Sequence, residues 1–240
     1  MTVDQRIKAY SIWVSDLHLG SKGSRVREFL LFLDRLDCKQ LILNGDIVDK
    51  FFIDATKPPS NDEHAVIEGI NQLSEKGVSI RFCIGNHDKR SDISRLFPAV
   101  KLCDDFVYNS RANKRYWVLH GHQVDYFDLF KRNWIGKFGV FFYEAMLSVS
   151  PPSRHKNRSF SRLIKRSIKR VMTFLFMYEY FLKRSVHKQQ VQGLIYAHTH
   201  HMQDEFKHGI HYLNSGDWID TCSYIMETDS GDFFVKRFTL

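Results

Sequence analysis

The feature that most constrains the fold of this chain is a series of short apolar segments, each ending in acidic, amide or imidazole side chains. The endings are DLHLG after Tyr10–Ser15, GDIVD after Gln40–Asn44, GNHD after Val78–Ile84, HGH after Tyr116–Leu119, and AHTHH within and after Gly193–Ala197. Such apolar runs are typical of buried strands. A glycine followed by Asp or Asn is ordinary turn chemistry after one strand, but turns do not readily explain five such endings.

Helical patterns separate the first of these strands. Apolar residues recur at helical spacing over residues 24–37, and a second helix is predicted over about 62–76, with Gly77 as its C-cap. Alternating strands and helices predict a layered α/β domain, in which ligands sit beyond the carboxyl ends of the strands. Short strands near 211–214, 222–227 and 233–238 are predicted as an antiparallel finish to this core.

The AHTHH ending allows two interpretations. It is either a polar strand end wetted by solvent or part of a metal site, because the strand period of two would put His198 and His200 on one face. Two imidazoles on one face can share a metal or serve two adjacent metals. His201 would point away from that face, and a solvated role is predicted for it.

The ordered series DxH, GDxxD, GNHD, HG and AHTH, from Asp16 to His200, resembles the calcineurin-like metallophosphoesterase superfamily. The segments SDLHLGSKGSRVREFLLFL, HGHQVDYFD and YLNSGDW make the chain similar to the UDP-2,3-diacylglucosamine pyrophosphohydrolases of lipid A synthesis and their near relatives. The resemblance implies an α/β fold, a four-layer α-β-β-α metallophosphoesterase sandwich with a helical cap insertion. It also implies two bound metal ions.

The same resemblance implies seven metal ligands. Asp16, His18 and His200 would hold the first metal; Asn86, His120 and His198 would hold the second; Asp46 would bridge them. Carboxylate, imidazole and amide ligands without thiolates suit two divalent ions such as Mn²⁺. Two adjacent metals can generate a hydroxide and hold both the attacking and the leaving oxygens at phosphorus, so we expect hydrolysis of a phosphoester or pyrophosphate bond.

Two further residues have implied catalytic roles. His87 would face the substrate phosphate or protonate the leaving oxygen, and Asp49 would orient it; the alternative is a His87 that only stabilises a turn. The best-known lipid A pyrophosphohydrolases have arginine at the position of His87, so their substrate does not transfer directly. Asp88 is predicted as a turn or orienting residue.

Candidate substrate contacts follow the fourth strand. His122 is predicted to lie near the metals or the substrate, and Asp125 and Asp128 are candidate sugar contacts. The core is predicted to comprise residues 1–126 and 191–240, with residues 127–190 forming a basic, aromatic, helical cap.

The cap contains an amphipathic pattern over Arg158–Arg184, with an apolar stripe and many Lys and Arg residues on other faces. Such a helix can lie at an anionic membrane surface, or it can pack on the domain. The two interpretations do not exclude each other. The aromatic residues of the cap could bury acyl chains, and its cations could bind a diphosphate.

Cysteine usage, apolar runs and net charge predict where the protein is located and what it binds. The four cysteines are scattered without a CxxC pair, which predicts reduced thiols in a cytosolic protein. No signal peptide is predicted, and the longest nearly apolar run, Val171–Leu182, is too short to span a bilayer. We therefore expect a cytoplasmic protein, peripheral to the inner membrane. The net charge of +8 and pI near 9.3 favour an anionic partner.

Three functions compete on these observations. The first is a peripheral-membrane hydrolase that cleaves the pyrophosphate of UDP-2,3-diacylglucosamine, or of a related lipid-linked nucleotide sugar, and releases UMP. The second is a phosphodiesterase or phosphatase acting on nucleic acid or soluble nucleotides. The positive net charge of the chain is the observation that favours such an anionic substrate. The third, a scaffold without activity, is disfavoured because all seven expected ligands are present.

Overall fold

The computed structural model describes residues 6–49, 52, 59–124 and 189–239. The chain forms two compact units, one of residues Met1–His122 with Gln189–Leu240 and one of residues Gln123–Lys188. Nearly all of the predicted cap lies outside the described residues, so its helical structure and its bounds stay predictions. The description that follows concerns the first unit.

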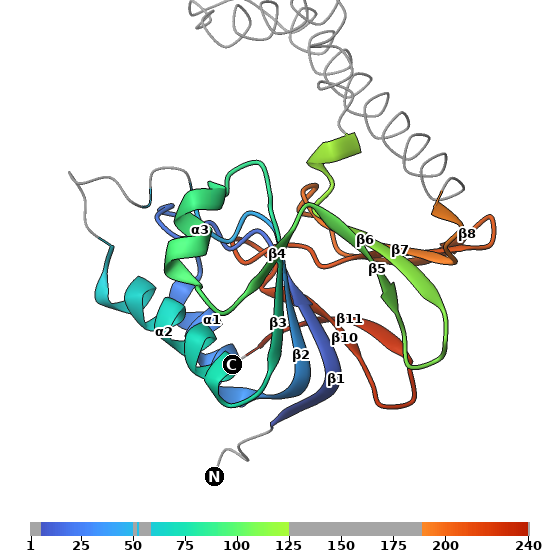
Figure 1. Ribbon diagram of the computed structural model, residues 1–240, viewed down its shortest axis with the longest axis horizontal. Helices are drawn as coiled ribbons and strands as arrows, with labels where there is room; N and C mark the ends of the chain where they lie inside the picture. The colour runs from blue at the N-terminus through green and yellow to red at the C-terminus, as the bar shows by residue number, and fades with distance from the viewer. Residues whose placement is uncertain (1–5, 50–51, 53–58, 125–188, 240) are drawn as a thin grey trace, which may run out of the picture. The chain divides into compact units, whose positions relative to one another are not determined.

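The first unit contains two sheets (Figure 1). The larger has the order β11-β10-β1-β2-β3-β4. Its strands are β1 Ile7–Val14, β2 Leu36–Asn44, β3 Ser79–Cys83, β4 Lys101–Cys103, β10 Ser223–Glu227 and β11 Phe233–Arg237. Strands β1 to β4 run parallel, whereas β10 and β11 join antiparallel at the edge beside β1.

The smaller sheet has the order β5-β6-β7-β9-β8. Its strands are β5 Asp105–Asn109, β6 Arg115–Leu119, β7 Gly193–Tyr196, β8 Gln203–Lys207 and β9 Ile210–Asn214. Strands β6, β7 and β9 run parallel and the two edge strands antiparallel. The expected antiparallel strands at the end of the chain are therefore confirmed for β10 and β11. Strand β9 differs, because it pairs antiparallel only with β8 and runs parallel to β7.

Three α-helices cover one face of the larger sheet (Figure 1). They are α1 Val26–Arg35, α2 Asn61–Glu75 and α3 Arg90–Leu96, and a 3₁₀ turn, η1, spans His122–Val124. Helix α2 begins with a capping box. The Ser60 side chain accepts a hydrogen bond from the backbone N–H of Glu63, and the Glu63 carboxylate accepts one from the backbone N–H of Ser60. The chain leaves α2 at Gly77, whose φ of +91° explains the predicted glycine there.

Alternation along the strands produces two apolar cores. Ile12 and Leu41 pack against the helices, whereas their neighbours Trp13 and Ile42 pack against Val118 of the second sheet. This is the period of two expected of a sheet buried on both faces. The described residues form three of the four predicted layers, helices on sheet on sheet, and the predicted α/β sandwich is confirmed for them.

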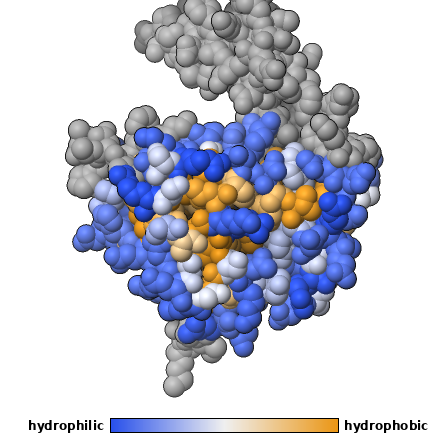
Figure 2. Space-filling view, in the orientation of Figure 1, coloured by the Kyte–Doolittle hydropathy of each residue, from blue (hydrophilic) through white to orange (hydrophobic). Residues whose placement is uncertain are grey.

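Strands β4 and β5 form the edges of the two sheets on one side of the sandwich. Figure 2 shows apolar residues reaching the surface across the middle of the view, around the position of β4 in Figure 1. Cys103 and Phe106, both half-buried, pack against the inter-sheet core. The Arg81 guanidinium lies 4.1 Å from the centre of the Phe106 ring.

The structure corrects several predicted bounds. The predicted strand at Gln40 begins earlier, because α1 passes directly into β2 at Leu36 with extended backbone angles. Four short elements were not predicted, namely α3, β4, β5 and β8. None of the helices in the described part of the chain is both long and apolar enough to cross a membrane.

Candidate dinuclear metal centre

The loops that follow β1, β2, β3, β6 and β7 contain the polar residues that the sequence placed at strand ends. Backbone hydrogen bonds join these loops: Asp16 donates to the Gly45 carbonyl and His18 to the Asp46 carbonyl, both at 3.0 Å. Ala197 donates to the His120 carbonyl at 2.8 Å. The loops therefore meet at one edge of the sandwich, as expected for the carboxyl ends of parallel strands.

The first ligand group consists of Asp16, His18 and His200, whose ligand atoms lie within 4.8 Å of one another. Asp16 Oδ1 is 3.2 Å from His200 Nε2 and 4.0 Å from His18 Nε2. Asp16 is fully buried, and the His200 side chain is 37% exposed. These are the three residues expected to hold the first metal.

The second ligand group consists of Asp46, His120 and His198. Asp46 Oδ2 lies 3.2 Å from His120 Nε2 and 3.9 Å from His18 Nε2, between the two groups. This is the position that a bridging carboxylate requires. The other Asp46 oxygen accepts from the His87 backbone at 2.7 Å and ties the GNHD loop to the bridge.

The backbone of the ligand residues has an unusual conformation. Five of the seven predicted ligands have φ between 51° and 68°: Asp16, His18, Asp46, His198 and His200. This left-handed region is strained for residues other than glycine, and such residues cluster at functional sites. The strand β7 ends at Tyr196, so the prediction that His198 and His200 share one face of a strand is wrong; left-handed turns direct them to different groups.

Two glycines allow the loops to pack closely. A Cβ atom at Gly45 would lie 2.4 Å from His120 Nδ1, and one at Gly85 would lie 2.2 Å from Asp46 Oδ1. Only hydrogen fits in either place. The glycines of the GD and GN endings are therefore required by contacts with two ligand residues as well as by turn chemistry.

Asp88 is buried and organises the bridging loop. Its carboxylate accepts hydrogen bonds from the backbone N–H groups of Gly85, Asp46, Ile47 and Val48, at 2.7–3.1 Å. Burial raises the pKa of Asp88 to about 7, against these N–H groups, which favour the charged form. Asp88 thus holds the GNHD and GDIVD loops together, which agrees with the predicted orienting role.

Two of the predicted histidine ligands contact an oxygen atom through their second ring nitrogen. His120 Nδ1 lies 2.8 Å from the Asn44 carbonyl, and His200 Nδ1 lies 3.2 Å from Asp217 Oδ2. Sequence reasoning did not assign a role to Asp217. The available signal was its place two residues past Ser215 in YLNSGDW, just beyond β9, which is a further strand ending in polar residues.

The electrostatics favour cations at both groups. Burial alone would lower the pKa of His120, but the Asp46 carboxylate beside it raises the pKa to about 9. Asp16 and Asp217 raise the pKa of His200 to about 10. Burial opposes ionisation of Asp46, yet His120 and His87 hold its pKa well below the usual range. The carboxylates therefore attract positive charge, and divalent ions can displace the imidazole protons.

Buried side-chain atoms that lack a hydrogen-bond partner also support two metal sites. Four buried ligand atoms have no hydrogen-bond partner among the described residues: Asp16 Oδ1, His18 Nε2, Asn86 Oδ1 and His120 Nε2. A buried polar atom without a partner destabilises a protein by about 1–3 kcal/mol. Bound cations at the two groups would satisfy the Asp16, His18 and His120 atoms, and the mixed oxygen and nitrogen donors suit a borderline divalent ion.

The predicted catalytic pair lies beside the first ligand group. His87 Nδ1 is 3.5 Å from Asp49 Oδ2, and His18 Nδ1 is 3.7 Å from the same oxygen. The His87 side chain is 40% exposed, and its ring centre lies 4.8 Å from that of His18. These three residues could themselves hold a cation, but His18 directs its Nε2 to the first group, and the Asp49 carboxylate lies within ion-pair distance of both rings.

The remaining predicted residues differ in their outcome. The His122 ring centre lies 5.6 Å from that of His120 and 6.5 Å from that of His198, so His122 borders the second group. His201 is exposed, which agrees with a solvated role. Asp125 and Asp128 lie outside the described residues, and their predicted sugar contacts stay predictions.

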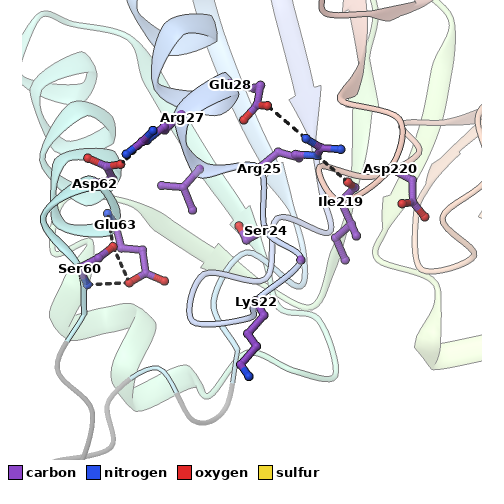
Figure 3. Close-up of a pocket in the computed structure, with 12 residues that line it drawn as sticks. Lys22, Ser24, Arg25, Arg27, Glu28, Ser60, Asp62, Glu63, Ile219 and Asp220 are labelled. Carbon is purple, nitrogen blue, oxygen red and sulfur yellow. Dashed lines mark hydrogen bonds and ion pairs between the residues drawn. The ribbon is translucent and has the colours of Figure 1, made fainter.

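A hollow of about 570 Å³ lies beside the loop that follows His18 (Figure 3). Figure 3 shows its two arginines paired with acidic residues: Arg27 with Asp62 at 3.0 Å, and Arg25 with Glu28 at 3.4 Å. None of the predicted ligands lines this hollow. We therefore locate the chemistry at the strand ends and not in this hollow.

An α/β sandwich with two adjoining ligand groups at the carboxyl ends of its strands has the architecture of a dinuclear metal-dependent hydrolase. A family model described as calcineurin-like phosphoesterase matches residues 12–202. The chain therefore belongs to the calcineurin-like phosphoesterase family. It is a metal-binding phosphoesterase, and its two candidate ligand groups agree with the two divalent metals of that family.

Solved structures resemble this chain only distantly. An archaeal phosphodiesterase is 12% identical, with a TM-score of 0.48 over 95% of this chain and 98% of its own. The phosphoesterase YfcE from E. coli is 15% identical, with a TM-score of 0.46 over 95% and 99%. A single mutant of Vps29 from Entamoeba histolytica is 13% identical, with a TM-score of 0.46 over 95% and 99%. No curated protein sequence matches this chain.

Proposed function

We propose that this phosphoesterase hydrolyses the pyrophosphate bond of UDP-2,3-diacylglucosamine, or of a closely related lipid-linked nucleotide sugar, and releases UMP. The observation that supports hydrolysis at phosphorus is the half-exposed His87, oriented by Asp49 beside the two ligand groups. The lipid-linked substrate is supported by the resemblance of three sequence segments to the lipid A pyrophosphohydrolases.

The first group would bind one ion through Asp16, His18 and His200, and the second would bind another through Asn86, His120 and His198, with Asp46 between them. Two such ions supply Lewis acidity for the phosphoryl oxygens and lower the pKa of bound water. We propose Mn²⁺ as the metal, because the donor set contains oxygen and imidazole nitrogen without thiolate.

The residues of the chain complete the chemistry. We propose that His87 holds a proton near a phosphoryl or leaving oxygen, and that Asp49, 3.5 Å from its Nδ1, helps to orient the ring. Histidine at this position, in place of arginine, offers the substrate a ring N–H donor instead of the bidentate fork of a guanidinium.

The basic insertion provides the proposed membrane contact. We propose that its cations and aromatic residues bind the diphosphate and the acyl chains, and that the protein acts in the cytoplasm at the surface of the inner membrane. This part of the proposal rests on the sequence pattern of residues 127–190 alone.

The test measures UMP release from UDP-2,3-diacylglucosamine in mixed detergent micelles, using the full chain with Mn²⁺. We expect metal-dependent UMP formation that is stimulated by detergent and reduced about 100-fold or more by His87→Ala. The matched control is His201→Ala, which removes an exposed imidazole from the neighbouring loop and should leave the rate unchanged.

Soluble substrates separate the proposal from its alternative. Turnover of RNA or of a soluble nucleotide phosphodiester, with no UMP released from the lipid, would refute the lipid-linked substrate. That result would favour the phosphodiesterase or phosphatase of nucleic acid or soluble nucleotides, which the net charge of +8 supports. Binding to nucleic acid would then weaken steeply with added salt. The absence of activity on all these substrates with bound Mn²⁺ would refute the catalytic assignment itself.

A further inference from the structure

The segment Ser215–Trp218, with the sequence SGDW, follows β9 and has no assigned role in the phosphoesterase site. We propose that Asp217 in this segment is a positioning residue for the first metal, because it fixes the ring of His200 so that Nε2 faces the ligand group. This inference requires the dinuclear centre but does not depend on the identity of the substrate.

The first observation is how the two ring nitrogens of His200 are used. Nδ1 lies 3.2 Å from Asp217 Oδ2, and Nε2 lies 3.2 Å from Asp16 Oδ1 in the first ligand group. A neutral histidine that binds a metal through one nitrogen carries its proton on the other, and a carboxylate that accepts this proton fixes both tautomer and orientation. Asp217 is placed to be that carboxylate.

The second observation is that the Asp217 side chain is itself held in place. It is 1% exposed, and its Oδ1 accepts from the backbone N–H groups of Ile219, Asp220 and Thr221 at 2.8–3.3 Å. The Thr221 hydroxyl adds a bond at 3.0 Å. With Oδ1 engaged by the loop, Oδ2 is directed at His200.

The third observation is that the same loop supports the other end of the first group. Trp218 is fully buried, packs edge-on against Phe29 at 4.7 Å, and donates its backbone N–H to the Asp16 carbonyl at 3.1 Å. Ser215 contacts Ser15, the neighbour of Asp16, at 2.6 Å. The segment therefore joins Asp16 and His200, two ligands of one metal, to the core between α1 and the first sheet.

The second ligand group is supported differently. His120 Nδ1 contacts the backbone carbonyl of Asn44, a neutral acceptor at the end of β2. A change at Asp217 should therefore weaken the binding of one metal and spare the other. This selectivity distinguishes a positioning role from a general effect on the fold.

The experiment uses Asp217→Asn in the full chain. Asparagine keeps an oxygen for the loop N–H groups but replaces the oxygen that faces His200 with an NH₂ group, which cannot accept the Nδ1 proton. The matched control is Asp220→Asn, an exposed residue of the same loop. Mn²⁺ binding is measured by isothermal titration, and the tautomer of His200 by long-range ¹H–¹⁵N NMR of the protein loaded with diamagnetic Zn²⁺.

We expect Asp217→Asn to bind one of the two Mn²⁺ equivalents about 10- to 100-fold more weakly, with loss of a single Nδ1–H tautomer of His200. Asp220→Asn should behave as wild type. Unchanged affinity and tautomer would overturn the proposal, and so would equal weakening of both equivalents together with a lower melting temperature without metal. If wild type binds no Mn²⁺, the dinuclear centre itself is refuted, whatever substrates are turned over.

Discussion

Substitution of Gly85 by alanine tests whether close packing of the loops builds the metal centre. A Cβ at this position would lie 2.2 Å from Asp46 Oδ1, 2.3 Å from Asp46 N and 2.9 Å from Asp46 Cγ. Ordinary contacts between such atoms are about 3.5 Å, so the GNHD loop or the bridging Asp46 has to move by roughly 1 Å. None of these three contacts is with the flexible end of a long side chain.

A displacement of about 1 Å at a catalytic site reduces activity by about 100-fold, and overpacking of this kind costs about 1–3 kcal/mol of stability. We therefore expect Gly85→Ala to fold, to bind Mn²⁺ more weakly, and to hydrolyse a generic substrate such as bis(p-nitrophenyl) phosphate about 100-fold more slowly. Circular dichroism and urea unfolding report on folding, and isothermal titration reports on the metal.

The matched control is Gly77→Ala at the end of α2. Gly77 has φ +91°, and no atom lies within 4 Å of the position that an alanine methyl group would take, so alanine there introduces backbone strain of about 1 kcal/mol without a clash. It should lose stability and keep metal affinity and activity. The reasoning is refuted if Gly85→Ala is folded and binds Mn²⁺ like wild type, or if both variants lose activity equally.

Three further predictions concern stability, measured by urea unfolding. Asp88→Ala leaves four backbone N–H groups without their acceptor and should lose about 3 kcal/mol or more, whereas a loss below about 1 kcal/mol would contradict the bridging-loop role. Ser60→Ala removes the capping box of α2 and should lose about 1 kcal/mol at any pH between about 6 and 8, with Mn²⁺ affinity unchanged. Burial holds the pKa of His211 below its ordinary 6.5 despite Asp204, so the folded protein binds fewer protons than the unfolded chain and stability falls as pH drops from about 7 towards 5. His211→Gln should flatten this fall by at most about 1.4 kcal/mol per pH unit, and an identical slope in both proteins would refute the assignment.

The sequence by itself determined the class of fold and predicted the set of candidate ligand residues. Apolar strands ending in Asp, His and Asn require a sheet edge where these side chains meet, because the carboxyl ends of parallel strands lie together. The order of the motifs was then sufficient to predict Asp16, His18, Asp46 and His120 as candidate ligands, and the structure brings them into two adjoining groups. The local pattern sufficed here because each of these residues follows closely after a buried strand.

The family motifs already assigned the ligands to two metals, but only the tertiary structure shows the backbone geometry that brings them into two groups and the contacts that support them. His198 and His200 lie two residues apart, yet left-handed backbone angles send them to different groups, against the strand alternation that the sequence suggested. The contact of Asp217 with His200 joins loops after different strands, and the space that only Gly85 allows is defined by Asp46, 39 residues earlier in the chain. Sequence periodicity describes neighbours along one element, whereas these contacts arise where several chain segments pack within a few ångströms of each other.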